Sequence, residues 1–598
     1  MASFVGRSAT QSLSRTVFRQ ELSMAAPQTY EAVNEPILDF KLGSPESKKL
    51  EEALKRLENK IVDVPIIVGD EEIRTKHVQH QVRPFDHRKP VATFYYATPE
   101  VIHKAIDTSL KVRKEWERRP QEERSKIFLR AADLLSQKYH MDILAATMLG
   151  QGKNIVQAEI DASAELIDFL RFDVMFAQKI TEYQPISPDK RTLNTMTYRG
   201  MEGFWAAVCP FNFTAIGAHL PMAPALVGNV CLWKPSDTAV LSNYIAFQAF
   251  REAGLPPGVI NFLPSDGPVF GNTVTSSPDL AGINFTGSAK TFKHLWKQVA
   301  ENIDIYKTFP RLIGECGGKN LHFIHNSADV ESVVMGTIRA AFEYNGQKCS
   351  ACSRMYVPQS LWPKIKSQLL QILKEVKIGS PLERSSFVTA VIDDKVFARI
   401  KQYLDFVKSD PSHTILAGGG CNDEKGYFVE PTLIETKDPE SRMMTEEIFG
   451  PVLTVYPYPD EQFEQTVSLA AHTSPYGLTG AIYTKDKEVK AYLRDAFRDA
   501  AGNFYINDKC TGSVVGQQPF GGARLSGTND KAGGPHYLLK FISMQSSKES
   551  FEFLKDWKYL QCKTSLCLFA FSQDTMVVKW GSLLMTCLLH VYPGIYIH

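Results

Sequence analysis

Short apolar runs alternate with helical stretches between residues 203 and 288, and this rhythm limits the fold more than any other feature of the chain. Each run is long enough for one buried strand, and each intervening stretch suits a helix packed against it. Such alternation is typical of an α/β protein with a parallel sheet, which binds dinucleotides at the carboxyl ends of its strands. The expected strands are 204–210, 230–235, 259–264 and 282–288, and the expected helices are 214–228 and 238–253.

The rest of the chain predicts more helices and a second α/β region. The alternating segment 192–200 predicts a strand, as one arm of a projecting hairpin. A second α/β region is expected from near Arg311 onward. The chain has 598 residues, enough for roughly three to four structural units. Helical spacing is found at 47–61, 98–118, 121–138, 155–182 and 329–343.

The charge balance limits the kinds of binding partner that we expect, and the cysteines limit the cellular compartment. Lys and Arg number 67 and Asp and Glu 66, so the net charge of +1 gives no large field for nucleic acid or an anionic membrane. The 10 cysteines are spread too unevenly to form a disulfide framework, so a reducing compartment is expected. The first twenty residues are rich in Arg and Ser and contain no acid, which is typical of a mitochondrial transit peptide. We expect it at 1–24; the alternative is a disordered cytosolic tail.

A candidate phosphate site stands between a strand and a helix. Gly287 and Ser288 occupy this turn, and the backbone N–H groups of a helix start can bind a phosphate. The region contains no GxGxxG fingerprint, and Gly-Ser is common in such turns, so an ordinary turn is the alternative.

Cys349 is the candidate nucleophile. It follows Lys348, whose charge would favour the thiolate, and a thiolate attacks carbonyl carbon readily. The alternative is a buried, inert cysteine, the more common state of an intracellular Cys. Cys349 and Cys352 form a CxxC, but no second pair follows at zinc spacing, so we expect no metal.

Glu315 is the candidate general base. It lies in the glycine-rich segment 314–320, where the backbone can approach other groups closely. Apolar surroundings would raise the pKa of its carboxyl group toward the range useful for a base. The alternative is a surface Glu in a turn.

Six segments in this order resemble motifs of the aldehyde dehydrogenase superfamily, over about Asn34 to Tyr559. Within it, 507–530 and the GQKCSACSR segment are most similar to the mitochondrial branch that oxidises glutamate semialdehyde. The six are PFNF (210–213), WKPSD (233–237), NFTGS (284–288), GECGGKN (314–320) with the NGQKCSACSR that follows, EEIFGPV (446–452) and PFGGARLSGT (519–528).

The resemblance implies a role for each matching residue. Cys349 is the nucleophile, Glu315 activates the water that hydrolyses the thioester, and Asn212 with the backbone N–H of Cys349 holds the oxyanion. The implied cofactor is NAD. Its expected contacts are Cys209, Lys234, Gly287, Ser288, Ala289, Lys290, Thr291, Glu447 and Phe449, and the expected substrate contacts are Phe213, Ser350, Gly512, Ser513 and Phe520.

The resemblance also implies an architecture. The fold is α/β and aldehyde dehydrogenase-like, with a Rossmann-type NAD-binding domain, an α/β catalytic domain and a β bridging element. The expected ranges are 40–180 and 200–312 for NAD binding, 313–510 for catalysis, and 181–199 with 511–560 for bridging, oligomerisation and the substrate loop.

The chain departs from the family pattern in three places. Cys209 and Cys510 stand where the family usually has Ser, and both changes conserve size. The third is the extension 561–598, which matches no family segment, and its apolar run 582–589 is far shorter than a membrane span.

The expected function is NAD-dependent oxidation of L-glutamate γ-semialdehyde to glutamate, in proline catabolism in the mitochondrial matrix. The expected partners are this small substrate and further copies of the chain, in a homodimer or higher oligomer, without nucleic acid or a membrane span. Three alternatives stay open: another semialdehyde or aldehyde dehydrogenase, a catalytically silent protein on this scaffold, and a thiol hydrolase. The presence of Cys349, Glu315 and Asn212 argues against a catalytically silent protein. A requirement for NAD would exclude a thiol hydrolase.

Overall fold

The computed structural model describes residues 30–559, so the transit peptide expected at 1–24 and the extension at 561–598 lie outside the described residues. The chain forms two compact units. The larger unit runs to Gln184 and resumes from Met196 to Ser546, and the smaller unit contains Pro185–Thr195 and the residues from Ser547 onward. Every residue of the candidate site described below belongs to the larger unit.

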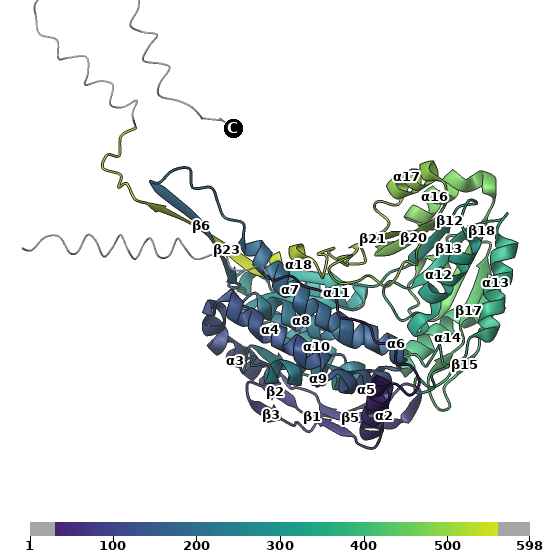
Figure 1. Ribbon diagram of the computed structural model, residues 1–598, viewed down its shortest axis with the longest axis horizontal. Helices are drawn as coiled ribbons and strands as arrows, with labels where there is room; N and C mark the ends of the chain where they lie inside the picture. Colours follow the sequence, from purple (N-terminus) through teal and green to yellow (C-terminus); the bar gives the residue numbers. More distant parts are fainter. Residues whose placement is uncertain (1–29, 560–598) are drawn as a thin grey trace, which may run out of the picture. The chain divides into compact units, whose positions relative to one another are not determined.

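The first of two seven-stranded sheets contains the four strands expected between residues 203 and 288. Its order is β11-β10-β7-β8-β9-β2-β3 (Figure 1). The strands from β11 to β9 are parallel, whereas β2 and β3 pair in antiparallel fashion at one edge. The bounds are β2 Ile66–Val68, β3 Glu71–Ile73, β7 Phe204–Val208, β8 Cys231–Lys234, β9 Ile260–Phe262, β10 Leu280–Thr286 and β11 Arg311–Glu315. The expected α/β fold with a parallel sheet is therefore confirmed.

Helices cover both faces of this sheet. Neighbouring residues of a strand point to opposite faces, so two adjacent residues of β10 show the contacts on each side. All seven residues of β10 are buried. Asn284 donates a hydrogen bond to the carbonyl of Leu220 on one side, and Phe285 stacks on Phe292 on the other. The helices of this part of the chain, in sequence order, are α2 Pro45–Glu58, α3 Pro99–Arg118, α4 Gln121–Ser136, α5 His140–Gln151, α6 Ile155–Ala158, α7 Glu165–Thr181, α8 Thr214–Leu226, α9 Val240–Glu252, α10 Gly267–Thr275 and α11 Ala289–Glu301.

The second sheet has the order β14-β17-β18-β13-β12-β20-β21 and is parallel except for β14. Because β11 belongs to the first sheet, the change of sheet occurs between Glu315 and Asn320. The domain boundaries stay a prediction. The bounds are β12 Asn320–Ile324, β13 Cys352–Pro358, β14 His413–Ala417, β17 Thr432–Thr436, β18 Val452–Tyr458, β20 Thr479–Tyr483 and β21 Asn503–Ile506.

Side chains at successive positions of β13 point to opposite faces of the second sheet and pack against different helices. Met355 and Val357 pack with residues of α12 and α13, whereas Tyr356 packs with residues of α16 and α17. Each face therefore has its own apolar core. The helices of this part are α12 Val330–Phe342, α13 Trp362–Glu375, α14 Asp394–Ser409, α15 Arg442–Thr445, α16 Phe463–His472 and α17 Lys487–Ala496. The short helix α18 Pro535–Leu539 instead packs against α7, in the core of the first sheet.

Smaller sheets complete the fold. The segment expected as a strand at 192–200 is β6 (Thr192–Gly200), and it pairs with β23 (Ile542–Ser550). The remaining strands are β1 Val62–Val64, β4 Val78–Arg83 and β5 Asp86–Tyr95 in one three-stranded sheet, and the pairs β15 Cys421–Asn422 with β16 Phe428–Val429 and β19 Tyr476–Gly477 with β22 Ala523–Arg524.

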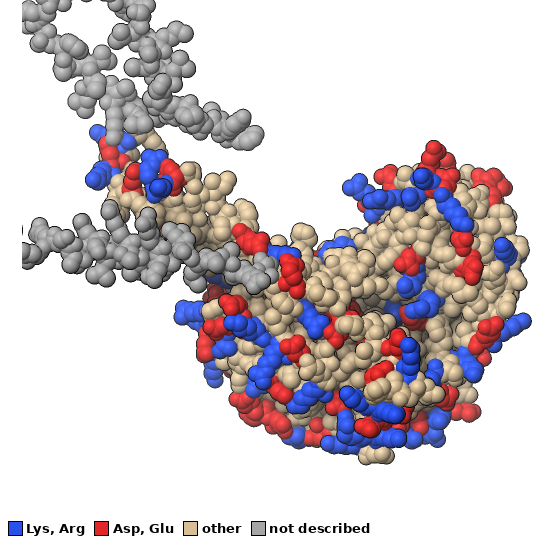
Figure 2. All heavy atoms as spheres, in the orientation of Figure 1, with Lys and Arg blue, Asp and Glu red and all other residues tan. Residues whose placement is uncertain are grey.

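The described surface carries charges of both signs. On the face shown in Figure 2, basic and acidic residues are interspersed. None of the helices within residues 30–559 combines the length and the hydropathy needed to cross a bilayer.

Candidate active site

Cys349 lies in a turn between a 3-10 helical turn (Glu343–Gly346) and β13, and the backbone before it is unusual. Tyr344, Asn345 and Gly346 have φ angles of 50°, 57° and 65° in succession. The left-handed region costs an L-residue roughly 1–2 kcal/mol because Cβ crowds the backbone. The surrounding structure must therefore hold this segment in place.

Buried hydrogen bonds hold it. The Tyr344 hydroxyl donates to the carbonyl of Gln151 at 2.8 Å, and Asn345 Nδ2 donates to the carbonyl of Ala390 at 2.7 Å. The Gln347 side chain accepts from the N–H of Ile392 at 2.9 Å. The strained segment thus fixes the position of Cys349. Strained backbone of this kind is common at functional sites.

The glycines of GECGGKN allow the nucleophile turn to approach closely. A Cβ on Gly318 would lie 2.7 Å from the backbone oxygen of Cys349, and a Cβ on Gly317 would lie 2.0 Å from Oε1 of Glu447. Glu447 Oε1 instead accepts a hydrogen bond from the N–H of Gly318 at 2.8 Å. Asn320 donates from Nδ2 to the backbone oxygen of Cys349 at 2.6 Å. These contacts bring the GECGGKN segment together with the turn that carries Cys349 and with Glu447.

Cys349 is half-buried. Burial raises the pKa of Cys349, and the carboxyl groups of Glu315 and Glu447 raise it further. The expectation that Lys348 favours the thiolate is wrong here, because Lys348 forms an ion pair with Glu343 at 2.9 Å. The surroundings of Cys349 therefore favour the protonated thiol over the thiolate.

Glu315 ends β11 and has the character expected of a base. Burial raises its pKa well above the ordinary value, Asp530 raises it further, and the charge of Lys531 acts against both. Its Oε1 atom is buried without a hydrogen-bond partner among the described residues. The predicted rise in pKa is confirmed, and the free oxygen is available to a water molecule.

Asn212 lies just before α8, and its amide reaches the nucleophile segment. The side chain is buried, and Nδ2 donates to the carbonyl of Gln347 at 3.1 Å. The structure thus places an amide donor beside the turn that carries Cys349. A second N–H of the same amide group remains for an oxyanion.

One cavity of about 380 Å³ brings together residues from distant parts of the sequence. Cys349 and Glu315 both line it. The five residues expected to contact substrate line it as well: Phe213, Ser350, Gly512, Ser513 and Phe520. Ser350 is tied to the substrate loop, because its Oγ lies 2.7 Å from Oγ1 of Thr511. Gly512 has a φ of 88°, which favours glycine at this point of the loop.

Five of the residues expected to bind the cofactor, residues 287–291, follow one another at the start of α11. Ser288 caps α11 by accepting the N–H of Thr291 at 3.2 Å, so the helix start with Ala289 and Lys290 follows directly on β10. The N–H of Gly287 donates to the carbonyl of Glu315 at 3.1 Å. This turn therefore joins the candidate phosphate site to the candidate base.

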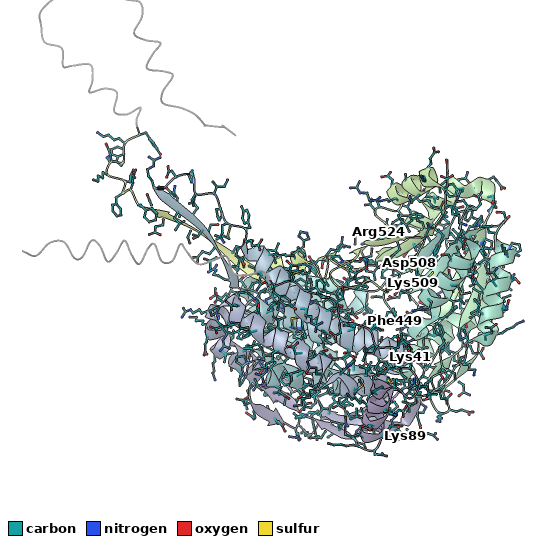
Figure 3. All side chains as sticks on the ribbon, in the orientation of Figure 1. Lys41, Lys89, Phe449, Asp508, Lys509 and Arg524 are labelled. Carbon is teal, nitrogen blue, oxygen red and sulfur yellow. The ribbon has the colours of Figure 1, made fainter. Side chains whose placement is uncertain are left out.

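Glu447 and Phe449 approach the other side of the GECGGKN segment. The pKa of Glu447 is raised to about 7 by burial, which outweighs the Gly318 hydrogen bond and the charges of Arg399 and Lys319. Phe449 has a φ of 56°, and its ring meets Phe211 edge-on at 5.8 Å. Figure 3 labels Phe449 and Lys509, the latter a residue of the cavity wall.

Cys209 and Lys234 lie at the ends of β7 and β8. The Cys209 thiol donates to the carbonyl of Gly217 at 3.1 Å and so points into α8. The N–H of Cys209 donates to the carbonyl of Lys234 at 3.1 Å. Neither residue lines the cavity, and their cofactor contacts stay a prediction.

The sequence reasoning missed several cavity residues. Glu165 and Asp168 line the wall from α7, and burial raises the pKa of Glu165 well above its ordinary value and that of Asp168 to about 6. Lys531 faces Glu315 while its Nζ donates to the carbonyls of Gly502 and Gly521 at 2.8 Å each. Charged residues on a buried helical face were the only available signal for the α7 pair.

Comparison with known proteins decides the family. A profile of the aldehyde dehydrogenase family matches residues 72–547, most of the chain. The chain belongs to the aldehyde dehydrogenase family. The resemblance seen in the six sequence motifs is thereby confirmed.

This aldehyde dehydrogenase is similar to curated relatives over nearly its whole described length. It is 58% identical over 530 residues to the mitochondrial Δ1-pyrroline-5-carboxylate dehydrogenase of Danio rerio, covering 88% of this chain and 95% of the relative. It is 59% identical over 527 residues to the protein of the same name from Homo sapiens, covering 88% and 93%.

A solved structure matches the fold of this aldehyde dehydrogenase. The Δ-pyrroline-5-carboxylate dehydrogenase from Mycobacterium tuberculosis, bound with NAD, superposes with a TM-score of 0.87 at 42% identity. The match covers 90% of this chain and 99% of that chain.

Proposed function

We propose that this aldehyde dehydrogenase oxidises L-glutamate γ-semialdehyde to glutamate with NAD, the step of proline catabolism that consumes Δ1-pyrroline-5-carboxylate. The observation that carries the proposal is the cavity that joins Cys349 and Glu315 to the loop of Gly512 and Ser513. The curated relatives, 58% and 59% identical, bear the name of this activity. The cavity is of a size that suits a small substrate.

The acylation step uses Cys349 and its neighbours. The half-buried Cys349 thiol first loses its proton to solvent. The thiolate sulfur then attacks the aldehyde carbon, and the carbonyl oxygen becomes an alkoxide in a thiohemiacetal. The Asn212 amide and the backbone N–H of Cys349 stabilise the charge as it develops, which is the largest contribution in many acyl-transfer enzymes. Loss of hydride from the former aldehyde carbon leaves a thioester on Cys349.

The deacylation step uses Glu315. In its ionised form, the buried Glu315 carboxylate accepts a proton from water, and the resulting hydroxide attacks the thioester carbonyl. The Cys349 thiolate leaves, and glutamate is released. The raised pKa makes the ionised Glu315 carboxylate a stronger base than the carboxylate of a free glutamate.

The residues present fit NAD. When bound, NAD accepts the hydride, and the protein supplies position and surroundings. The N-terminus of α11, with Ser288 as its cap, would hold a phosphate of the cofactor through backbone N–H groups. The same turn contacts Glu315 through Gly287, while Glu447 and Phe449 lie beside GECGGKN.

Both charged groups of an amino-acid semialdehyde have partners on the cavity wall. Ser513 and the backbone at Gly512 would donate to the α-carboxylate, and Lys509 adds a positive charge nearby. Glu165 and Asp168 supply acceptors for the α-ammonium group. Phe213 and Phe520 would pack against the aliphatic chain. A simple aliphatic aldehyde would leave these polar groups without a ligand partner.

We infer a mitochondrial matrix location, which the word mitochondrial in the relatives' names and the composition of residues 1–24 support. We also infer a homodimer or higher oligomer. The β6–β23 ribbon has two strands, and seven of the nine residues of β23 are exposed. Such a ribbon is marginally stable alone, so a second copy would stabilise it. Light scattering on the purified protein tests this.

An assay of the purified protein tests the proposed activity. We expect reduction of NAD with glutamate semialdehyde, and no turnover after Cys349→Ala, while Cys421→Ala retains the activity. Cys421 is half-buried in the small β15–β16 sheet, so it serves as a matched control. Turnover without NAD would support a thiol hydrolase, and a preference for aliphatic aldehydes would support another branch of the family. No turnover of any aldehyde would support a silent scaffold.

A further inference from the structure

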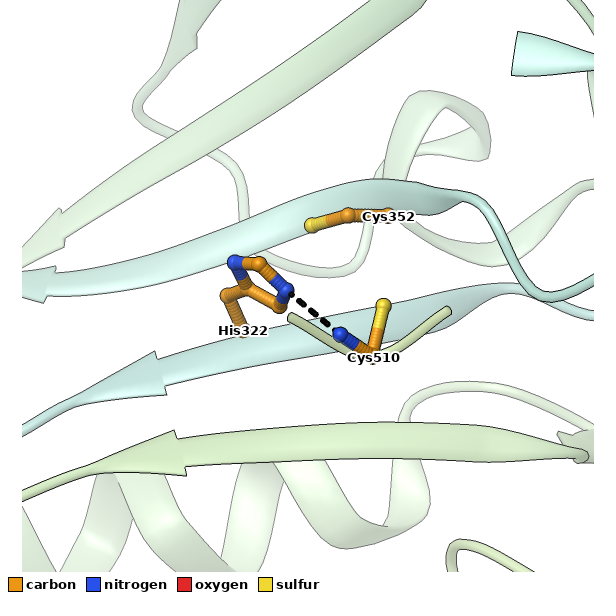
Figure 4. Close-up of side chains that lie close together, drawn as sticks. All are labelled: His322, Cys352 and Cys510. Atoms are coloured by element: carbon orange, nitrogen blue, oxygen red, sulfur yellow. Dashed lines mark hydrogen bonds between the residues drawn. The ribbon is translucent and has the colours of Figure 1, made fainter. Parts of the chain in front are cut away.

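Three side chains from separate segments meet beneath the substrate loop. His322 comes from β12, Cys352 begins β13, and Cys510 lies in the loop after β21 (Figure 4). All three are buried, and one donor atom of each lies within 4.8 Å of the others. The mechanism proposed above uses none of them.

We propose that His322, Cys352 and Cys510 form a buried site for a thiophilic d¹⁰ cation, with Zn²⁺ as the ion it fits best. Two sulfur atoms and one imidazole nitrogen are the donors that such ions prefer. Metal bonds of about 2.3 Å to sulfur and 2.0 Å to nitrogen place tetrahedral donors about 3.5–4 Å apart. A small inward movement of the three side chains therefore closes the site.

The hydrogen bonds of His322 orient it for this role. Nδ1 lies 3.0 Å from Oγ1 of Thr337, and Nε2 lies 3.3 Å from the backbone nitrogen of Cys510. Because Nε2 accepts that N–H, it is the unprotonated nitrogen, and Nδ1 carries the proton toward Thr337. A metal-bound histidine is commonly oriented in this way by a partner on its other nitrogen. The 3.3 Å contact is long and is readily exchanged for a metal bond.

A backbone carbonyl oxygen lies beside one of the three donors. The Cys510 thiol is 3.3 Å from the carbonyl of Ser350, which also accepts from Oγ1 of Thr479 at 3.3 Å. The burial of all three side chains leaves no open position for substrate, so the site is structural. An ion there would join β13 to the loop of Gly512 and Ser513, next to the Ser350–Thr511 hydrogen bond.

Cobalt is the probe that tests this site, because Co²⁺ substitutes for Zn²⁺ and its thiolate bonds absorb in the near ultraviolet. The full chain would be produced in cobalt-supplemented medium under reducing conditions, in a Cys349→Ala background that removes the catalytic thiol as a ligand. Cobalt per chain and the thiolate-to-cobalt absorption would be compared between this protein and two further variants. Cys510→Ser removes one proposed ligand, and Cys421→Ser is the matched control.

We expect Cys510→Ser to lose one cobalt ion per chain and the absorption band, and Cys421→Ser to keep both. We also expect Zn²⁺ to raise the melting temperature of the parent and not that of Cys510→Ser, because binding only to the folded state stabilises it. Equal cobalt content and absorption in the parent and Cys510→Ser would overturn the proposal, as would equal losses in Cys421→Ser. If Cys510→Ser fails to fold, Cys352→Ser gives the same comparison.

Discussion

Asn320 holds the turn that carries Cys349: its Nδ2 atom lies 2.6 Å from the backbone oxygen of Cys349 and 2.9 Å from that of Ala351. Its Oδ1 accepts the N–H of Thr479 at 3.0 Å, so one amide joins β12, β20 and the nucleophile turn. The GECGGKN segment thus supplies both the base, Glu315, and the clamp on the nucleophile. The position of Cys349 relative to Glu315 depends on this amide.

The first prediction concerns this clamp. Asn320→Ala leaves two buried carbonyls and an N–H without partners, which costs about 1–3 kcal/mol per group. If a cost of this size reaches the transition state, kcat falls by roughly 5–150-fold. NAD binding, measured by fluorescence titration, should remain, since the N-terminus of α11 is elsewhere. Asn422→Ala, on an exposed residue of β15, is the control, and equal kcat values would contradict the clamp.

The second prediction concerns Gly317. A Cβ there would lie 2.0 Å from Oε1 of Glu447, so Gly317→Ala forces the flexible carboxyl group away from the N–H of Gly318. We expect lower activity with a small change in melting temperature, because the carboxyl end of the side chain can move. Gly267→Ala is the matched control, since nothing lies within 4 Å of its added Cβ. A parallel loss of activity in both variants would exclude a role for the Glu447 contact.

The third prediction concerns deacylation and its pH dependence. Burial raises the pKa of Glu315, so its protonated form persists to a pH at which a free Glu is ionised. The base form grows as the pH rises, and steady-state turnover should rise with it. Glu315→Gln should slow thioester hydrolysis by roughly 10²–10⁴-fold and remove this pH dependence. Stopped-flow absorbance should then show a burst of reduced cofactor before a slow steady state, whereas a uniform slowing without a burst would assign Glu315 another role.

The fourth prediction concerns substrate recognition. Ser513→Ala should raise the KM for glutamate semialdehyde, because one hydrogen bond to a charged group is worth about 1.5–3 kcal/mol, or roughly 10–150-fold. The KM for a simple aliphatic aldehyde should hardly change, since that substrate has no carboxylate. Ser409→Ala, at the exposed end of α14, is the control. If both substrates are affected alike, Ser513 supports the loop and does not recognise the carboxylate.

The amino-acid sequence alone predicted four of the seven strands of the first sheet, β7 to β10. The strand β11 also belongs to this sheet, although the second α/β region was expected to begin near Arg311. The strands at 204–210 and 282–288 were recognisable because a parallel strand, buried on both faces, is a continuous apolar run. The segment 155–182 was predicted as helical, and the structure divides it into α6, a π-helical turn over Glu159–Ala164, and α7. Short edge strands such as β2 and β3, with three residues each, give too little pattern to be recognised.

The sequence alone also identified the candidate chemistry, because Cys349 and Glu315 lie in segments whose residue types suit a nucleophile and a base. Only the tertiary structure decided the electrostatics of Cys349. Lys348 is next to Cys349 in the chain, but it forms an ion pair with Glu343, and the pKa of Cys349 is raised. Glu165 and Cys510 join the site surroundings from distant segments, which no local pattern encodes. Hydrophobic periodicity is a property of neighbours in the chain, whereas charge, burial and metal-ligand geometry depend on neighbours in space.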